Sequence, residues 1–179
     1  NKEVNRLVTF LNTIKKDNKK TYIYGASTKG NCLLQYANIG ENLTDYAVER
    51  NPKKIGKMTN TGVEIIGEDT MRENPPDYML VLPWHFRDEI ILRESVFLEK
   101  GGQLIFPFPH FEVVSKKKRL LITGCDGLIG YYVKQRFQDS YCMYGITRHP
   151  EKGEPHITKF SLDMTNKPDL EHAMDIIKP

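Results

Sequence analysis

The sequence predicts an α/β fold in which helices cover both faces of a parallel sheet. Short apolar segments alternate with amphipathic ones along the chain, as they do when helices connect parallel strands. Two glycine-containing turns, at 25–30 and 124–130, each follow an apolar segment and precede a helical one. A basic segment, 116–119, separates two such series. Together these features predict a Rossmann-like sheet followed by a truncated second Rossmann-type βα unit.

The first series begins with an amphipathic helix over 3–17, where apolar residues recur on one face. Strands are expected at 21–25, 45–50, 63–67, 78–83 and 103–109. Helices are expected over 26–40, 68–74 and 85–102, where glycines or prolines mark their ends. The segment 110–118 then carries the chain to a second start.

The second series alternates in the same way. Strands are expected at 119–124, 141–148 and 156–163, and helices over 128–139 and 168–177. Three strands are only half of a doubly wound sheet, so this unit is expected to be incomplete. We therefore predict a first domain at 1–112, a linker at 113–119 and the first part of a second domain at 120–179.

Composition excludes several classes of protein. A net charge of +3 is too small to favour nucleic acid, and the lysine clusters are interpreted as solvated ends. Three widely spaced cysteines without a CxxC pair favour a reducing compartment, and no histidine spacing predicts a metal site. Because no apolar run approaches about 18 residues, we expect no membrane association and a cytoplasmic location.

The second glycine turn has the GxxGxxG spacing of the extended short-chain dehydrogenases and sugar epimerases, which it resembles. The first glycine permits a tight turn, the second admits a pyrophosphate, and the third lets the helix approach the strand. The free amides at the helix start favour an anion. The predicted cofactor-binding residues of this turn are Gly124, Asp126, Gly127, Leu128, Ile129 and Gly130.

Three residues after the next two strands fit the same cofactor. Arg148 stands where an acidic residue would bind the ribose of NAD, and an arginine there favours NADP. It could equally be an ordinary exposed arginine. Asp163 and Met164 resemble the segment along the adenine, although Asp163 could be a turn cap. The superfamily's YxxxK pair does not occur in the chain, so we expect cofactor binding without the chemistry.

The first glycine turn places Ser27 and Lys29 between Gly25 and Gly30. It does not match a Walker A loop, because its lysine precedes the second glycine, and it lacks the closely spaced glycines of methyl-donor loops. Backbone amides, a hydroxyl and a lysine could still bind an anion there. Glu49, which ends the next strand, is a candidate ribose-binding acid. A turn used only for close packing is the alternative.

Four blocks of sequence resemble the C-terminal domain of bacterial sugar C-methyltransferases: "YIYGASTKGNCLLQYANIG", "DYAVERNPKKIGK", "PDYMLVLPWHFRDEI" and "GGQLIFPFP". The resemblance covers about residues 1 to 110. It implies a Rossmann-like domain beside a nucleotide-linked keto-deoxysugar, with S-adenosylmethionine and the principal catalytic groups in preceding domains. Glu49 replaces the family's more usual Asp, and "TNTGVEI" departs from its Pro-Gly loop.

The resemblance assigns substrate-binding candidates and leaves the catalytic residues unknown. Trp84 and His85 end the fourth strand at the same edge, although the tryptophan could simply close the sheet and the histidine could be a plain surface residue. The substrate-binding candidates are Gly25, Ser27, Lys29, Gly30, Asn31, Glu49, Arg50, Asn51, Trp84 and His85.

Two functions follow as expectations. The first is a fragment of a bifunctional enzyme, in which a C-methyltransferase is fused to an NADP- or NAD-dependent sugar reductase or epimerase. We expect this fragment to be inactive on its own. Its small-molecule partner would be a nucleotide-sugar of the dTDP-keto-deoxysugar type. The alternative is a non-catalytic module for nucleotide-sugar binding and assembly, since an open edge of the second sheet could pair with another copy of the chain.

Overall fold

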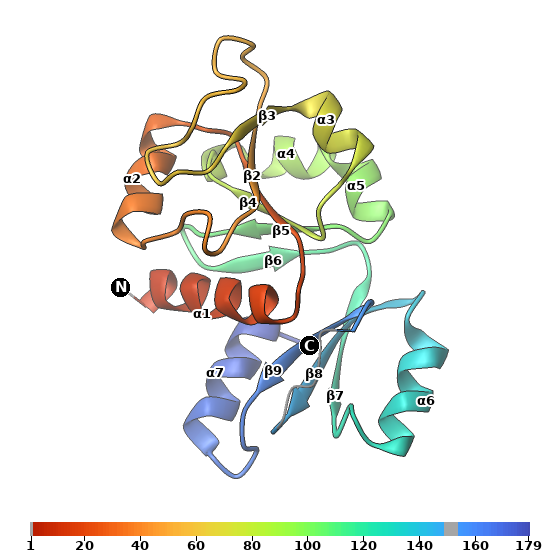
Figure 1. The fold of residues 1–179 in the computed structure, drawn as a ribbon. Helices are drawn as coiled ribbons and strands as arrows, with labels where there is room; N and C mark the ends of the chain where they lie inside the picture. Colours follow the sequence, from red (N-terminus) through yellow and green to blue (C-terminus); the bar gives the residue numbers. More distant parts are fainter. Residues whose placement is uncertain (1, 149–153) are drawn as a thin grey trace.

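The computed structural model describes residues 2–148 and 154–179, which form two sheets with a helix between them (Figure 1). The first sheet has the strand order β3-β2-β1-β4-β5-β6. Its strands are β1 (Thr21–Tyr24), β2 (Tyr46–Glu49), β3 (Ile65–Gly67), β4 (Tyr78–Val81), β5 (Gln103–Phe106) and β6 (Glu112–Val114). Strands β1 to β5 are parallel, as predicted, and β6 is antiparallel to β5.

Helices cover both faces of this sheet because successive strand residues point to opposite sides. In β4, Tyr78 and Leu80 face one core and Met79 and Val81 face the other. On the first face lie α1 (Lys2–Lys16) and α2 (Thr28–Tyr36). On the second face lie α3 (Glu68–Glu73), α4 (Arg87–Arg93) and α5 (Ser95–Glu99).

Two predicted boundaries need correction. The single helix expected over 85–102 is a short 3-10 turn, η1 (Trp84–Phe86), followed by α4 and α5, which are separated at Glu94. Glu94 is fully buried, and its carboxylate accepts two hydrogen bonds from Arg72 and one from the Tyr24 hydroxyl. A buried, hydrogen-bonded residue therefore stands where the prediction placed a solvent-facing position of one continuous helix. The expected connection after β5 contains β6, in which Val113 is buried and pairs with Ile105.

The second sheet is smaller and parallel, with the order β7-β8-β9. Its strands are β7 (Lys118–Thr123), β8 (Tyr141–Thr147) and β9 (Ile157–Ser161). Helix α6 (Leu128–Phe137) packs on one face, and α7 (Lys167–Ile177) packs on the other. The segment predicted as a linker, 113–119, contains most of β6 and the start of β7, and the division into domains stays a prediction.

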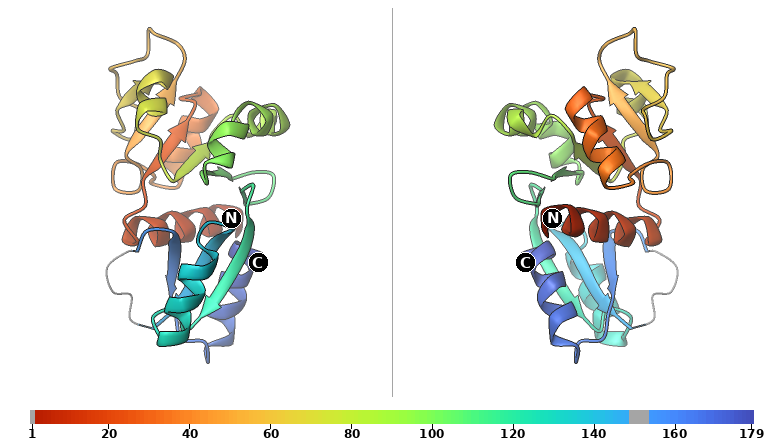
Figure 2. Two further views of the ribbon diagram at one scale, coloured as in Figure 1. Left: turned by 90° about the vertical axis from the view of Figure 1, so that its right-hand side faces the viewer. Right: turned by 90° about the vertical axis from the view of Figure 1, so that its left-hand side faces the viewer.

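Helix α1 belongs to the cores of both sheets (Figure 2). Phe10 is fully buried, with its ring centroid 5.5 Å from Tyr78 of β4 and 6.5 Å from Phe160 of β9. The buried Asp17, just after the helix, accepts a 3.1 Å hydrogen bond from the backbone amide of Lys159. The two units are therefore joined by a shared apolar layer and do not meet only through a connecting strand.

In the part of the chain that the structure describes, no helix has the length and apolar character needed to cross a membrane.

Candidate functional site

A cavity of about 490 Å³ opens at the carboxyl edge of the first sheet, beyond the ends of β1, β2 and β4. Strand β1 lies between β2 and β4, so the order in which the strands are added to the sheet reverses direction at this point. Such a switch point is where open α/β sheets usually bind ligands. The cavity is lined by Tyr24, Gly25, Ser27, Val48, Glu49, Arg50, Lys54, Glu68, Pro83, Phe86, Glu89, Ile90 and Arg93.

The glycine turn after β1 forms one wall of this cavity. Gly25 has φ +83°, a conformation that glycine adopts without steric cost. The Ser27 side chain caps α2 by accepting a 3.1 Å hydrogen bond from the amide of Gly30. A Cβ on Gly30 would lie 2.5 Å from a methyl carbon of Leu82. Gly30 is therefore required for helix-to-strand packing, whereas Gly25 and Ser27 reach the cavity.

The loop after β2 is tied to the glycine turn by Lys54. Its ammonium donates to the carbonyl of Ala26 at 2.9 Å and to the carboxylate of Glu49 at 3.1 Å. Glu49 also accepts hydrogen bonds from the backbone amides of Arg50 (2.9 Å) and Asn51 (3.3 Å). Burial opposes its charge, but these hydrogen bonds hold the pKa of Glu49 below its usual value. The Glu49 carboxylate is thus a fixed anion at the cavity wall.

Helices α3 and α4 bring a second set of charges to the cavity. Arg93 of α4 donates to both carboxylate oxygens of Glu68, at 2.5 and 2.6 Å. The Tyr24 hydroxyl donates to the buried Glu94, and burial followed by the charge of Glu94 raises the pKa of Tyr24 to about 12. Tyr24 therefore stays protonated at neutral pH and does not serve as a base.

Arg50 is the unpaired cation of the cavity. It is exposed, and within 2–148 and 154–179 its guanidinium has no carboxylate or carbonyl partner, unlike Lys54 and Arg93. A guanidinium that is free at a cavity wall can bind a phosphate through two parallel hydrogen bonds. Val48, Pro83 and Ile90 supply apolar surface beside it. A few polar groups within apolar walls are typical of small-molecule sites.

The structure brings together only part of the predicted substrate-binding set. Gly25, Ser27, Glu49 and Arg50 line the cavity. Asn51 contributes its backbone amide to Glu49 but is not in the lining.

The remaining predicted residues lie elsewhere. Lys29 is exposed on the first turn of α2, outside the lining. Asn31 donates to the Ser27 carbonyl and accepts from the amide of Asn60, so it fastens the loop that follows β2. Trp84 is half-buried, stacked on His85 at 5.0 Å between ring centroids, and neither side chain lines the cavity.

Sequence reasoning missed several lining residues. Lys54 and Glu68 lie in segments that follow strands β2 and β3, and this position could have marked them, because ligands sit at such strand ends. Glu89 and Arg93 come from α4. Whether their side chains face the cavity depends on how this helix packs on the sheet, and no sequence motif indicates that packing.

The second glycine turn has the backbone expected of a phosphate-binding loop. Gly124 has φ +64°, and a Cβ on Gly130 would lie 2.5 Å from the Gly124 carbonyl oxygen. Gly127 is extended and precedes α6, whose first amides are free of intrahelical partners. Leu128 and Ile129 are exposed on the first turn.

A buried lysine anchors this turn to β9. The Lys159 ammonium lies 2.6 Å from carboxylate oxygens of both Asp126 and Glu154, and only 1% of its side chain is exposed. Burial disfavours its charge, but the two carboxylates raise the pKa of Lys159 above its usual value. The pKa of Asp126 is lowered by the same contact, against the effect of burial. Asp126 therefore holds the turn in place.

The other predicted cofactor residues lie at the same carboxyl edge. Arg148 follows β8 and Asp163 follows β9, and parallel pairing aligns these ends. Hydrogen bonds from the amide and hydroxyl of Thr165 lower the pKa of Asp163, as does the nearby charge of Arg148. Met164 is exposed beside them.

Comparison with known proteins identifies the first part of the chain. Residues 1–109 match the family model described as the C-methyltransferase C-terminal domain. A curated relative, the C-methyltransferase NovU of Streptomyces niveus, is 34% identical over 105 residues. That match covers 58% of this chain and 25% of NovU, so the chain spans about a quarter of the length of this relative. The chain belongs to the family of C-methyltransferase C-terminal domains.

Proposed function

We propose that the switch-point cavity binds a nucleotide-linked keto-deoxysugar, which a C-methyltransferase then methylates at a ring carbon. The observation that carries this proposal is a cavity of about 490 Å³, with an unpaired arginine, inside the region that matches the family. Arg50 and the amides of the glycine turn would bind the pyrophosphate, except those of Gly25 and Gly30, which already donate to Val48 and Ser27. Glu49 would accept hydrogen bonds from ribose or sugar hydroxyls. Phe86, exposed at the rim, would provide apolar surface for the base.

In this proposal the chain binds and orients the sugar, and a separate part of the protein holds S-adenosylmethionine. The first glycine turn supports this division, because it lacks the closely spaced glycines of a methyl-donor loop. A keto group acidifies the C–H bond of the neighbouring ring carbon, so a base in that separate part would take the proton. S-adenosylmethionine would supply the methyl group to this carbon and leave as S-adenosylhomocysteine.

We further propose that residues 120–179 bind NADP or NAD as the first part of a sugar reductase or epimerase. The positive φ of Gly124, the close approach at Gly130 and the free start of α6 support pyrophosphate binding. Arg148 and Asp163 lie at the same sheet edge. A reductase beside a methyltransferase could reduce the same ketone, so both units would act on one sugar.

A non-catalytic binding and assembly module is the second candidate. It is favoured by β7, which in the described part of the chain pairs only with β8 and leaves one edge open. Leu120 and Leu121, on opposite faces of this edge strand, are only partly buried. The full reading frame of the gene distinguishes the two proposed functions. The bifunctional proposal requires an upstream methyl-donor loop and a downstream YxxxK segment. If the reading frame contains neither, the bifunctional proposal is wrong.

Calorimetry with a dTDP-sugar tests the first site. Arg50→Gln should weaken binding roughly tenfold, because it removes a charge-assisted contact to phosphate. Lys53→Gln makes the same charge change on the same loop, outside the lining, and should bind as the wild type does. Equal weakening in both variants, or no saturable binding to the wild type, would contradict the proposal.

Calorimetry with NADPH and NADH tests the second site. Arg148→Gln should weaken NADPH binding and leave NADH binding unchanged, because only NADPH carries the additional phosphate. Arg136→Gln, on the exposed side of α6, is the charge-matched control. Equal loss for both cofactors would refute the role of Arg148, and binding of neither cofactor to the wild type would favour a turn used only for packing.

A further inference from the structure

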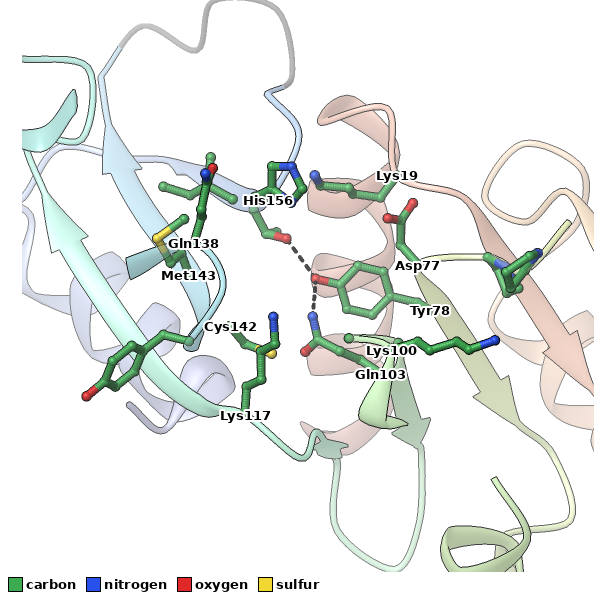
Figure 3. A pocket seen from close by; sticks show the side chains of 17 residues that line it. Lys19, Asp77, Tyr78, Lys100, Gln103, Lys117, Gln138, Cys142, Met143 and His156 are labelled. Atoms are coloured by element: carbon green, nitrogen blue, oxygen red, sulfur yellow. Dashed lines mark hydrogen bonds between the residues drawn. The ribbon is translucent and has the colours of Figure 1, made fainter. Parts of the chain in front are cut away.

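A second cavity, of about 350 Å³, lies between the two units (Figure 3). It is lined by the residues at the amino ends of β4 and β5 and by those at the amino ends of β8 and β9. It therefore lies at the opposite edge of the first sheet from the switch-point cavity. A ligand here would touch both units at once.

The floor of this cavity is a buried hydrogen-bonded network that crosses between the units. Tyr78 and Thr158 share a 2.7 Å hydrogen bond between their hydroxyls. The Gln103 side chain is 3.1 Å from the Tyr78 hydroxyl and 2.8 Å from the hydroxyl of Tyr144. All four residues are at least nine-tenths buried, and all except Tyr144 line the cavity.

This network has more donor hydrogens than it uses. The Gln103 amide has two and the three hydroxyls have one each, whereas three hydrogen bonds join these side chains and a further contact links the hydroxyls of Tyr144 and Tyr78. At least one donor hydrogen therefore remains, whichever way the Gln103 amide is oriented. A buried donor without an acceptor is unfavourable, so the floor is suited to a ligand with acceptor oxygens.

The walls add positive charge. Lys117 directs its ammonium toward Tyr78 and Gln103 (Figure 3), and no carboxylate or carbonyl in the described ranges pairs with it. Lys19 also lines the cavity and donates one hydrogen bond, of 2.8 Å, to the Glu154 carbonyl. Lys100 contributes charge at the rim, with its ammonium turned away.

One acid partly offsets these lysines. Asp77 is the acidic residue in the lining, and its carboxylate already accepts a 2.8 Å hydrogen bond from the amide of Lys20. The lining therefore has a net positive charge, which disfavours a cationic ligand.

We infer that this cavity binds a phosphate-bearing anion, held by Lys117 and the spare donor of the buried network, and that this anion bridges the two units. A phosphate group offers several acceptor oxygens and can engage the spare donor and the ammonium together. A carboxylate such as acetate carries a single negative charge, so the lysines of the lining attract it less strongly than phosphate. The site is independent of the proposed sugar site, because the two cavities have no lining residue in common.

The test uses the isotope-labelled 179-residue chain, with inorganic phosphate as the probe and the ionic strength held constant. Nuclear magnetic resonance then follows the side-chain amide signals of Gln103. These signals should shift with saturation. Lys117→Gln should raise the dissociation constant roughly tenfold, as expected for a lost charge-assisted contact. Acetate should bind at least several-fold more weakly than phosphate.

Lys116→Gln is a matched control, because its ammonium pairs with Glu99 on the surface at 3.0 Å, outside the cavity. This variant should bind phosphate as the wild type does. If Lys117→Gln does not fold, Lys19→Gln takes its place and should also weaken binding, by less than tenfold, because the Lys19 ammonium is shared with the Glu154 carbonyl. The inference is overturned if phosphate causes no saturable shift at Gln103, if both adjacent lysine variants weaken equally, or if acetate binds as tightly.

Discussion

Replacing Phe10 by alanine should destabilise both units together. Phe10 sits in the middle of α1 and is fully buried. Its ring makes edge contacts with Tyr78 and Phe111 of the first unit, at centroid distances of 5.5 and 5.7 Å, and it lies 6.5 Å from Phe160 of the second. Phe10 therefore packs against residues of both sheets. The cavity left when its ring is removed cannot close by movement of one unit alone.

The expected cost follows from this packing. Removing a buried phenylalanine side chain costs about 3 to 5 kcal/mol, and the upper part of this range applies where the surroundings cannot collapse. We therefore expect the free energy of unfolding to fall by about 4 kcal/mol. With a urea slope of about 2 kcal/mol per molar, the midpoint should fall by about 2 M.

Urea unfolding followed by two probes provides the assay. Fluorescence of Trp84, the single tryptophan of the chain, reports on the first unit, and amide signals of β8 report on the second. Both transitions should shift by the same amount. Tyr36→Ala, at an exposed aromatic position on α2, is the control and should change stability by at most about 0.5 kcal/mol.

A shift in one probe without the other would refute the shared core. A cost below about 1 kcal/mol, well under the usual range for a buried phenylalanine, would refute the packing argument for Phe10.

Three further predictions concern single positions. Gly130→Ala places a methyl carbon 2.5 Å from a carbonyl oxygen of the second glycine turn, so thermal unfolding should show a loss of about 2 kcal/mol or more. Burial raises the pKa of Asp17 to about 6, so its contribution to stability is greatest below about pH 4 and is lost as the pH rises to 6. Asp17→Asn should remove this part of the pH profile, up to about 3 kcal/mol, in unfolding measurements across that range. Glu94→Gln removes the buried negative charge that pairs with Arg72 and one of its two acceptor oxygens, and should cost about 2 kcal/mol in urea unfolding, whereas an unchanged midpoint would contradict that role.

The parallel sheet could be predicted because its strands are apolar on both faces. The four residues of β4 are all buried, two against each helical layer, so they form an uninterrupted apolar run in the sequence. Strand β6 has only three residues, too few to show a strand pattern, so the sequence did not reveal its antiparallel pairing with β5. The interruption at Glu94 depends on contacts with Arg72 and Tyr24, which are distant in the sequence.

The candidate site could be predicted where it depends on strand ends. Glu49 ends β2 and Arg50 follows it, and parallel pairing brings both to the carboxyl edge. Lys29 and Asn31 lie within α2, where the rotation of the helix decides whether a side chain faces the cavity. That rotation is set by the close packing of Gly30 against Leu82, which is a tertiary contact and not a motif.

A crystal structure of the chain with a bound dTDP-sugar tests the central claim most directly. The account predicts the pyrophosphate beside Arg50 and the Gly25 turn, with the sugar inside the switch-point cavity between Glu49 and Phe86. A dTDP-sugar bound at the Gly124 turn or between the two units, with the switch-point cavity empty, would contradict it.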